Sequence, residues 1–352
     1  MNELNITVVH FDDTIYFATL RAFGFIQLPI NIFGLYLIIY VSPKSMTYYY
    51  KCLLVKYQIL ATLLDLHMSW LICPLIFLPY LSGFANGLLH HALDLSGIAQ
   101  IFIWCYTLAA LTASILDLFE YRYQCSRMDK RSQITKTRIA LTIMFDLSFV
   151  QTSWIAYFKY PQNQDIAKLE LAKLWQTPID SLWYHQSIVL DICTFCFAHK
   201  ALLIIMSLCF VVAAIFVILT VYNLFWKKSS VSESTYRLQK TFLSALCVQI
   251  LVPFLLMIIP IYITFSRDEY TRTVINISLY TLSNHGFLGT LAMMCSNKYY
   301  RNFIISKLSF NLCKNKNTVI DVSPYSEHNK TRNSTHHQRK SPAIPKIRIS
   351  LL

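Results

Sequence analysis

The chain has 352 residues, of which 55% are hydrophobic and only 14% are charged, whereas about a quarter of the residues in a soluble domain carry charge. A mean hydropathy of +0.44 and a low glycine content exclude disordered, collagen-like and glycine-linker proteins. The net charge of +13 would suggest a nucleic-acid partner only if the basic residues formed a stripe on a soluble surface, but they collect between apolar runs. Composition therefore predicts a polytopic membrane protein.

Seven apolar stretches are each about 20 residues long, the length that crosses roughly 30 Å of hydrocarbon. They cover residues 16–41, 52–78, 97–120, 138–158, 200–226, 241–265 and 273–296. We therefore predict an all-α membrane protein, with a seven-transmembrane helix bundle over residues 16–296. Residues 1–15 lack the basic region of a cleavable signal peptide, so we expect the first span to stay as an uncleaved signal anchor.

The basic residues between the spans predict the orientation of the chain. The loops after spans one, three and five and the C-terminal tail hold 23 Lys and Arg, counting Arg138 at the boundary of span four, whereas the other side holds 5. Because cytoplasmic loops keep the excess of Lys and Arg, we expect the N-terminus outside and the C-terminus inside. Residues 1–15 are then extracellular, which agrees with a glycosylation sequon at Asn5.

Two segments follow the last span. In residues 297–314, Tyr300, Phe303 and Ile304 recur at helical spacing among basic residues, which predicts an amphipathic helix on the inner membrane surface. Cys313 in this segment is either a palmitoylation site or a free thiol. Residues 315–352 are polar and basic, and we expect a disordered cytoplasmic tail.

Sequence patterns for catalysis and metal binding are absent. There is no His-Glu-x-x-His, no Gly-rich phosphate loop and no Gly-x-Ser-x-Gly motif, so we predict no enzyme, no cofactor and no metal site. Cys193 and Cys196 form a single Cys-x-x-Cys pair, which is poor as a zinc site without a second pair. We expect them to pack in the structure or, as a second reading, to form an extracellular disulfide.

A charge within a span is costly and usually faces the bundle interior. Asp65 lies near the middle of span two, and its expected partners are Ser283, Asn284 and His285 in span seven. The group is either a polar switch that links the outer and inner halves or a static interhelical hydrogen bond.

Two prolines, Pro253 and Pro260, lie seven residues apart in span six and so on nearly one face. Each removes an amide hydrogen and weakens the helix, which indicates either a hinge that moves the inner end or a fixed kink.

Mixed aromatic and polar stripes in the outer half of the bundle suit a small-molecule pocket, although ordinary helix packing also produces them. The candidate residues are Gln100, Trp104, Thr107, Asn276, Tyr280 and Ser283.

An ordered set of short motifs over residues 15–310 resembles the nematode serpentine chemoreceptors of the Str superfamily, classes I and H. The motifs are Leu28-Pro29-Ile30-Asn31-Ile32-Phe33-Gly34-Leu35-Tyr36, Ser42-Pro43-Lys44-Ser45-Met46, Leu63-Leu64-Asp65, Pro79-Tyr80 with Gly83 and Gly87, Phe119-Glu120-Tyr121-Arg122, Gln249 with Pro253 and Pro260, His285-Gly286, and Tyr299-Tyr300-Arg301.

The resemblance implies a G-protein-coupled receptor in the plasma membrane of chemosensory neurons, in their cilia, that binds an odorant or a secreted metabolite and signals to a heterotrimeric G protein. Glu120 and Arg122 stand where such receptors place an acidic residue and an arginine. They point about 200° apart on a helix, so Arg122 is free to meet a carboxylate or a carbonyl elsewhere. No cysteine occupies residues 90–98, so the disulfide that commonly ties span three to the second outer loop has no counterpart.

Two other classes of membrane protein share this composition. A small-solute transporter would favour two matching halves, and the sequence has no internal repeat. A seven-span ligand-gated channel of the insect odorant-receptor kind would have its N-terminus inside, and the distribution of basic residues counts against that.

Overall fold

The computed structural model describes residues 12–43, 46–77, 81–126, 157, 160–175, 180–191, 197–226 and 272–316, together with 236, 237, 240, 241, 243, 244, 247 and 248. Met1–Ser306 form one compact unit and Lys307–Leu352 a second. Most of the predicted spans four and six, 138–158 and 241–265, lies outside the described residues.

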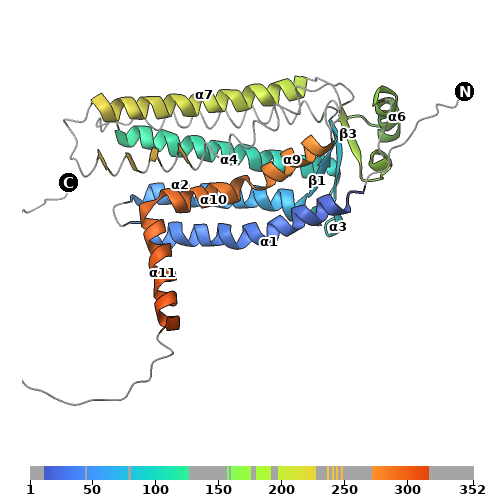
Figure 1. Ribbon diagram of the computed structural model, residues 1–352. Helices are drawn as coiled ribbons and strands as arrows, with labels where there is room; N and C mark the ends of the chain where they lie inside the picture. The colour runs from blue at the N-terminus through green and yellow to red at the C-terminus, as the bar shows by residue number, and fades with distance from the viewer. Residues whose placement is uncertain are drawn as a thin grey trace, which may run out of the picture. The chain divides into compact units, whose positions relative to one another are not determined.

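Helices form the described part of the bundle (Figure 1). They are α1 (Thr14–Tyr36), α2 (Tyr48–Leu66), α4 (Gly97–Ser126), α7 (Phe197–Trp226), α9 (Arg272–Ser283) and α10 (His285–Ser296). Short π-helical segments extend α1 to Val41 and α2 to Leu71. These helices coincide with predicted spans one, two, three, five and seven, although α4 runs six residues beyond the predicted end of span three.

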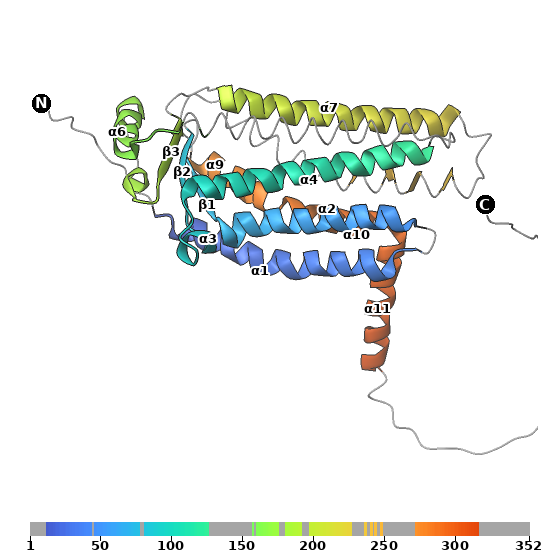
Figure 2. The same ribbon diagram turned by 180° about the vertical axis from the view of Figure 1, so that it is seen from behind.

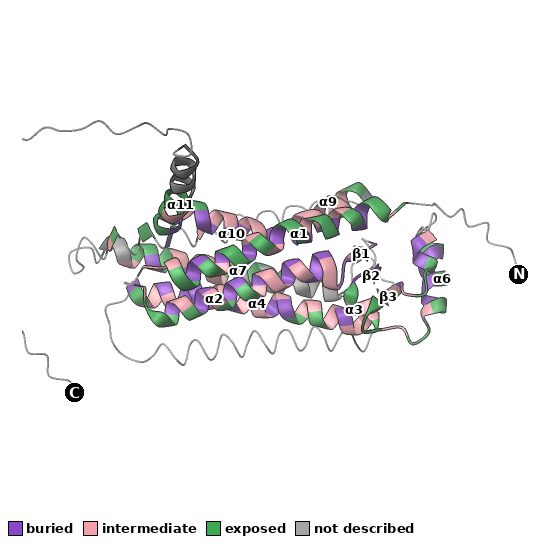
Figure 3. Ribbon diagram, turned by 90° about the horizontal axis from the view of Figure 1, so that it is seen from below, coloured by how far each residue is buried: buried purple, intermediate pink, exposed green. Residues whose placement is uncertain are grey.

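The helices lie side by side, with α2 in contact with α1, α4 and α10, and α4 also in contact with α7 (Figures 1 and 2). Exposed and buried residues alternate along α1 (Figure 3), and many of the exposed ones are large and apolar, such as Phe25 and Ile32. Outward apolar faces are characteristic of helices in lipid. By length and composition, Thr14–Val41 and Gly97–Ser126 are each able to cross a membrane.

A small antiparallel sheet corrects the all-α prediction. Its strands β1 (Pro74–Ile76), β2 (Leu81–Ala85) and β3 (Ile188–Asp191) pair in the order β1-β2-β3. Span two was predicted to continue to residue 78, but its helical part ends at Leu71. The carbonyl of His67 accepts the amides of both Ile72 and Cys73, and Cys73 has a φ of 49°, so the chain turns before Pro74. We call the end of the bundle that carries this sheet the sheet end, and the end where α2 begins the turn end.

Three short helices accompany the sheet and the bundle: α3 (Leu88–His91), α6 (Gln164–Trp175) and the 3₁₀-helix η3 (Asp180–Trp183). The face of α6 that holds Leu171 and Ala172 is buried. Lys168 shares this face and donates to the carbonyl of Tyr184 at 2.9 Å. Burial lowers the pKa of its ammonium group, and the Asp165 carboxylate opposes that shift.

Two hydrophobic clusters divide the core of the first unit along the bundle. The cluster at the sheet end joins β1, β2, β3, α6 and η3 to α1 and α9. The cluster at the turn end joins α1, α2, α4, α10 and the start of α11 (Lys298–Lys316), where Tyr300 is fully buried. Trp104 of α4 packs against both clusters and marks the boundary between them.

Candidate functional site

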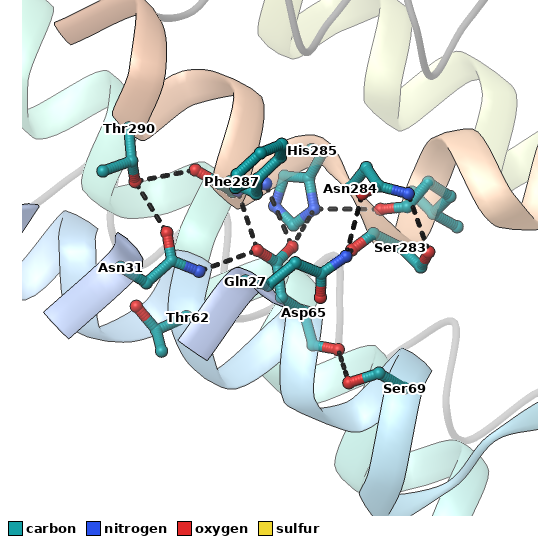
Figure 4. Close-up of polar contacts among 12 residues, drawn as sticks. Gln27, Asn31, Thr62, Asp65, Ser69, Ser283, Asn284, His285, Phe287 and Thr290 are labelled. Atoms are coloured by element: carbon teal, nitrogen blue, oxygen red, sulfur yellow. Dashed lines mark hydrogen bonds and ion pairs between the residues drawn. The ribbon is translucent and has the colours of Figure 1, made fainter. Parts of the chain in front are cut away.

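Asp65 is the centre of a buried polar site between three helices. Its side chain, with 1% of the residue exposed, points from α2 toward the start of α10 (Figure 4). One carboxylate oxygen accepts the amide of Gly286 at 3.0 Å, and the other accepts the amide of Phe287 at 2.8 Å. His285 Nδ1 lies 3.1 Å from the same carboxylate and Asn31 Nδ2 donates at 3.0 Å. The two backbone amides belong to the first turn of α10, where the helix dipole has its positive end.

The site exists because span seven is broken. Its predicted single helix is interrupted at Asn284, which separates α9 from α10 and frees the first amides of α10. Glycine at 286 allows the close approach, since a Cβ there would lie 2.6 Å from Asp65 Oδ2 and 2.8 Å from the carbonyl oxygen of Ala61. Asp65 thus performs the task of a helix cap from another helix.

The polar network extends along α1 on both sides of Asp65. Toward the turn end, the Thr290 hydroxyl donates to Asn31 Oδ1 at 2.7 Å and accepts from Gln58 Nε2 at 2.8 Å. Toward the sheet end, Gln27 Nε2 donates to the carbonyl of Ser283 and to Asn284 Oδ1, both at 3.0 Å.

The predicted partners of Asp65 therefore divide into two groups. His285 contacts Asp65 directly, whereas Ser283 and Asn284 bind Gln27 instead. Sequence reasoning did not single out Gln27 as part of this site. Its signal was available, because Gln27 and Asn31 are amides one helical turn apart in a mostly apolar span.

At the turn end, Glu120 and Arg122 are both buried but take different partners. Gln124 donates to Glu120 at 2.7 Å within α4. The Arg122 guanidinium lies over the ring of Tyr50, 3.7 Å from its centroid, which is a cation–π geometry. This aromatic contact with α2 was not among the partners that the sequence suggested for Arg122.

A second contact between α2 and α4 is an ion pair. Lys56 Nζ lies 3.1 Å from Asp117 Oδ2, and nearly half of the Lys56 side chain is exposed. Lys56 is eight residues from the start of α2, about 12 Å along a helix that rises 1.5 Å per residue. This pair was not predicted, because only Asp65 was considered as a charge within span two.

The six predicted ligand-binding residues lie on the sheet-end half of α4 and on α9. Gln100 and Thr107 are buried, and Tyr280 packs against Tyr16 and Phe23. Three polar atoms of this set are buried without a hydrogen-bond partner among the described residues: Gln100 Oε1, Trp104 Nε1 and Asn276 Oδ1. A buried polar atom without a partner is costly, so such atoms commonly bind a ligand or water.

Some predicted residues lie outside what the structure describes. They are Asn5, Cys193, Cys196, Pro253 and Pro260. Cys313 is in α11, but its side chain is outside the described part. Across the described residues, no group of three or more His, Cys, Asp or Glu side chains is arranged to hold a metal ion.

Comparison with known proteins identifies a family match over most of the chain. Residues 12–310 match the model of the family described as serpentine type 7TM GPCR chemoreceptor Srh. A relative in Caenorhabditis elegans, serpentine receptor class H-72, is 27% identical over 304 residues, which cover 84% of this chain and 85% of the relative.

Proposed function

Because the chain belongs to the Srh family of serpentine seven-transmembrane chemoreceptors, we propose that it binds a small molecule at the sheet end of the bundle and activates a heterotrimeric G protein from the turn end. The sequence resemblance left classes I and H open, and the family match is to class H. The receptor class and its place in a membrane follow from the family. The ligand site, the coupling and the orientation are part of the proposal.

The observation that carries this proposal is the position of the Asp65 site. Leu64 belongs to the turn-end cluster and Met68 to the sheet-end cluster, so Asp65 lies where the two clusters meet. Its bonds join α2 to α1 and to the start of α10. A ligand that shifts α9 or α10 therefore changes hydrogen bonds that also hold α1 and α2, and a change at one end is transmitted to the other.

The turn end supplies a candidate coupling surface. Arg122 is near the end of α4 and is held by Tyr50 at the start of α2. If the bundle rearranges, this pairing is available to exchange for contacts with the G protein. Pro253 and Pro260 are proposed as the hinge in span six that moves the same end.

The distribution of basic residues supports an orientation with the sheet end outside and the turn end inside. A multi-pass plasma-membrane location follows, and we place the protein in the cilia of sensory neurons, where it would meet an odorant or a secreted metabolite. The basic residues after position 297 then face anionic lipid, and Cys313 is a proposed site of acylation.

Expression in a reporter cell tests the function. The chain is screened against neutral alcohols, ketones, amides and esters and against carboxylates and amines, with calcium and cyclic nucleotide as readouts. We expect at least one compound to give a saturable response that Arg122→Ala abolishes at equal surface expression. Responses that persist in Arg122→Ala, or solute uptake without any second-messenger change, would contradict the proposal. Protease protection of an N-terminal tag in intact cells tests the orientation.

A further inference from the structure

The described segments above the sheet end form a cap on the bundle, made of β1, β2, β3, α6 and η3, which we call the lid. Its large side chains belong to the same hydrophobic cluster as those of the bundle. From the lid come Phe77, Phe84, Leu171, Leu182 and Val189, and from the bundle Leu20, Met68, Ile275, Leu279 and Leu282. Lifting the lid would transfer all of these side chains to water, which the hydrophobic effect opposes.

Both edges of the lid sheet are already occupied. At the outer edge of β1, which no strand pairs with among the described residues, the Tyr16 hydroxyl donates to the carbonyl of Pro74 at 2.7 Å. At the free edge of β3, the Gln164 side chain acts like a neighbouring strand: its Oε1 accepts the amide of Val189 at 2.8 Å and its Nε2 donates to the carbonyl of the same residue at 3.3 Å. The sheet is therefore closed to a further strand along β1 and β3.

Polar side chains fasten the lid and the neighbouring loop to α1. The Ser181 hydroxyl donates to Asp13 Oδ2 at 2.9 Å, and Arg21 Nη2 donates to the carbonyl of Asn86 at 3.1 Å. Lys168 is committed within the lid to Tyr184. These contacts give Asp13, Arg21 and Lys168 roles in holding the lid and the neighbouring loop.

Among the candidate ligand-binding residues below the lid, the buried polar atoms without a hydrogen-bond partner among the described residues are uncharged. Trp104 Nε1 is a donor, whereas Gln100 Oε1 and Asn276 Oδ1 are acceptors. A ligand that satisfies them carries both a donor and an acceptor, as a hydroxyl or an amide does. An ionised ligand would have to leave water for this apolar surrounding without a counter-charge from these residues, which is strongly unfavourable.

We infer that the ligand is a neutral, lipid-soluble molecule with a hydroxyl or amide head, and that it enters from the bilayer between helices while the lid stays closed. This inference rests on the proposed ligand site but concerns its chemistry and its access route. A molecule that partitions into the membrane is concentrated beside the bundle, and by this route it reaches Trp104 without opening the lid.

The route is tested with thiol reagents, so that no natural ligand is needed. Thr107→Cys places a thiol on the buried stripe of α4 in the full chain, reconstituted in phosphatidylcholine vesicles. The probes are benzyl methanethiosulfonate, which is neutral and lipophilic, and 2-(trimethylammonium)ethyl methanethiosulfonate, which is charged. Peptide mass analysis separates this site from the native cysteines.

In a second experiment, a disulfide holds the lid closed during labelling. A Cβ at Gly97 would lie 2.9 to 3.5 Å from side-chain atoms of Ile188, so Gly97→Cys with Ile188→Cys brings two sulfurs together between α4 and β3. Oxidation is confirmed by mass. The Thr107→Cys variant without this pair, treated with the same oxidant, is the control.

We expect the neutral reagent to label the Thr107→Cys thiol at least about tenfold faster than the charged one, and the lock to change that rate by less than about threefold, since lid opening is not on the path. The inference is overturned if the neutral reagent labels the thiol less than about tenfold faster than the charged one, or if neither reagent labels it. It is also overturned if the lock slows labelling by the neutral reagent more than about threefold. Labelling as expected together with a failed reporter screen would contradict the proposed function and leave the route standing.

Discussion

The carboxylate of Asp65 in α2 caps the start of α10 by accepting the backbone amide of Phe287 at 2.8 Å. A single side chain thereby stabilises the second half of a broken span and ties it to a neighbouring helix. The consequences for signalling and stability are open to measurement.

Asp65→Asn should lower stability by about 2–4 kcal/mol, because it removes a charged acceptor and turns an amide donor toward the amides that Asp65 now accepts. Basal or maximal signalling should change at the same time. Thermal unfolding of the detergent-solubilised receptor and dose-response curves at matched surface expression measure both effects. Ser69→Ala, which removes only the hydroxyl bonded to the Asp65 carbonyl, is the control. Two unchanged readouts would make Asp65 a replaceable packing residue.

Gly286→Ala should cost about 1–3 kcal/mol, because its methyl group would collide with the Asp65 carboxylate and with the rigid carbonyl of Ala61. The matched control is Gly97→Ala, where the methyl group would meet the movable end of Ile188. Melting temperatures of the two variants are compared. Equal decreases in melting temperature for Gly286→Ala and Gly97→Ala would show that α10 moves away from α2 without cost.

Tyr50→Phe should preserve signalling, whereas Tyr50→Leu should change basal activity, because only the leucine removes the aromatic face over which Arg122 lies. The contact contributes about 0.5–2 kcal/mol, enough to alter a balance between two receptor states several-fold. Second-messenger output without ligand is the measurement, at equal surface expression. The idea fails if the phenylalanine and leucine variants behave alike.

Gln164→Leu should destabilise the lid by about 1–3 kcal/mol, since the backbone amide and carbonyl of Val189 lose their partner at the edge of β3. Hydrogen exchange of the Val189 amide should accelerate. Glu170→Gln, an exposed change on the same helix, should leave this rate unaltered. An unaltered rate in Gln164→Leu would mean that other contacts alone hold β3.

Pro260→Ala should shift ligand potency together with basal activity, because a straighter span six changes the balance between two states separated by a few kcal/mol. Pro253→Ala is measured in parallel at matched surface expression. If only Pro253→Ala acts, the hinge lies there, and if neither acts, span six has no proline-dependent switch.

The sequence by itself predicted the spans that the described helices match. A stretch of about 20 apolar residues is long enough to cross a membrane whatever the rest of the fold is. It also identified Asp65 as a charge that must face the bundle, and it gave Ser283, Asn284 and His285 as expected partners, of which His285 contacts the carboxylate. Hydrophobicity could not predict the strand at Pro74–Ile76, because a buried strand and a helix end are equally apolar.

Only the tertiary structure decided which polar groups meet. The break at Asn284 frees the amides that Asp65 accepts, and although asparagine and glycine commonly interrupt a helix, the sequence of span seven does not show that Asp65 lies opposite these amides. Arg122 meets Tyr50 because α2 and α4 pack side by side, although the sequence directed attention to carboxylates and carbonyls. Likewise, Gln164 binds the edge of β3 only because the start of α6 lies beside that strand in the lid. Such pairings depend on the geometry between elements, whereas periodicity and composition describe each element alone.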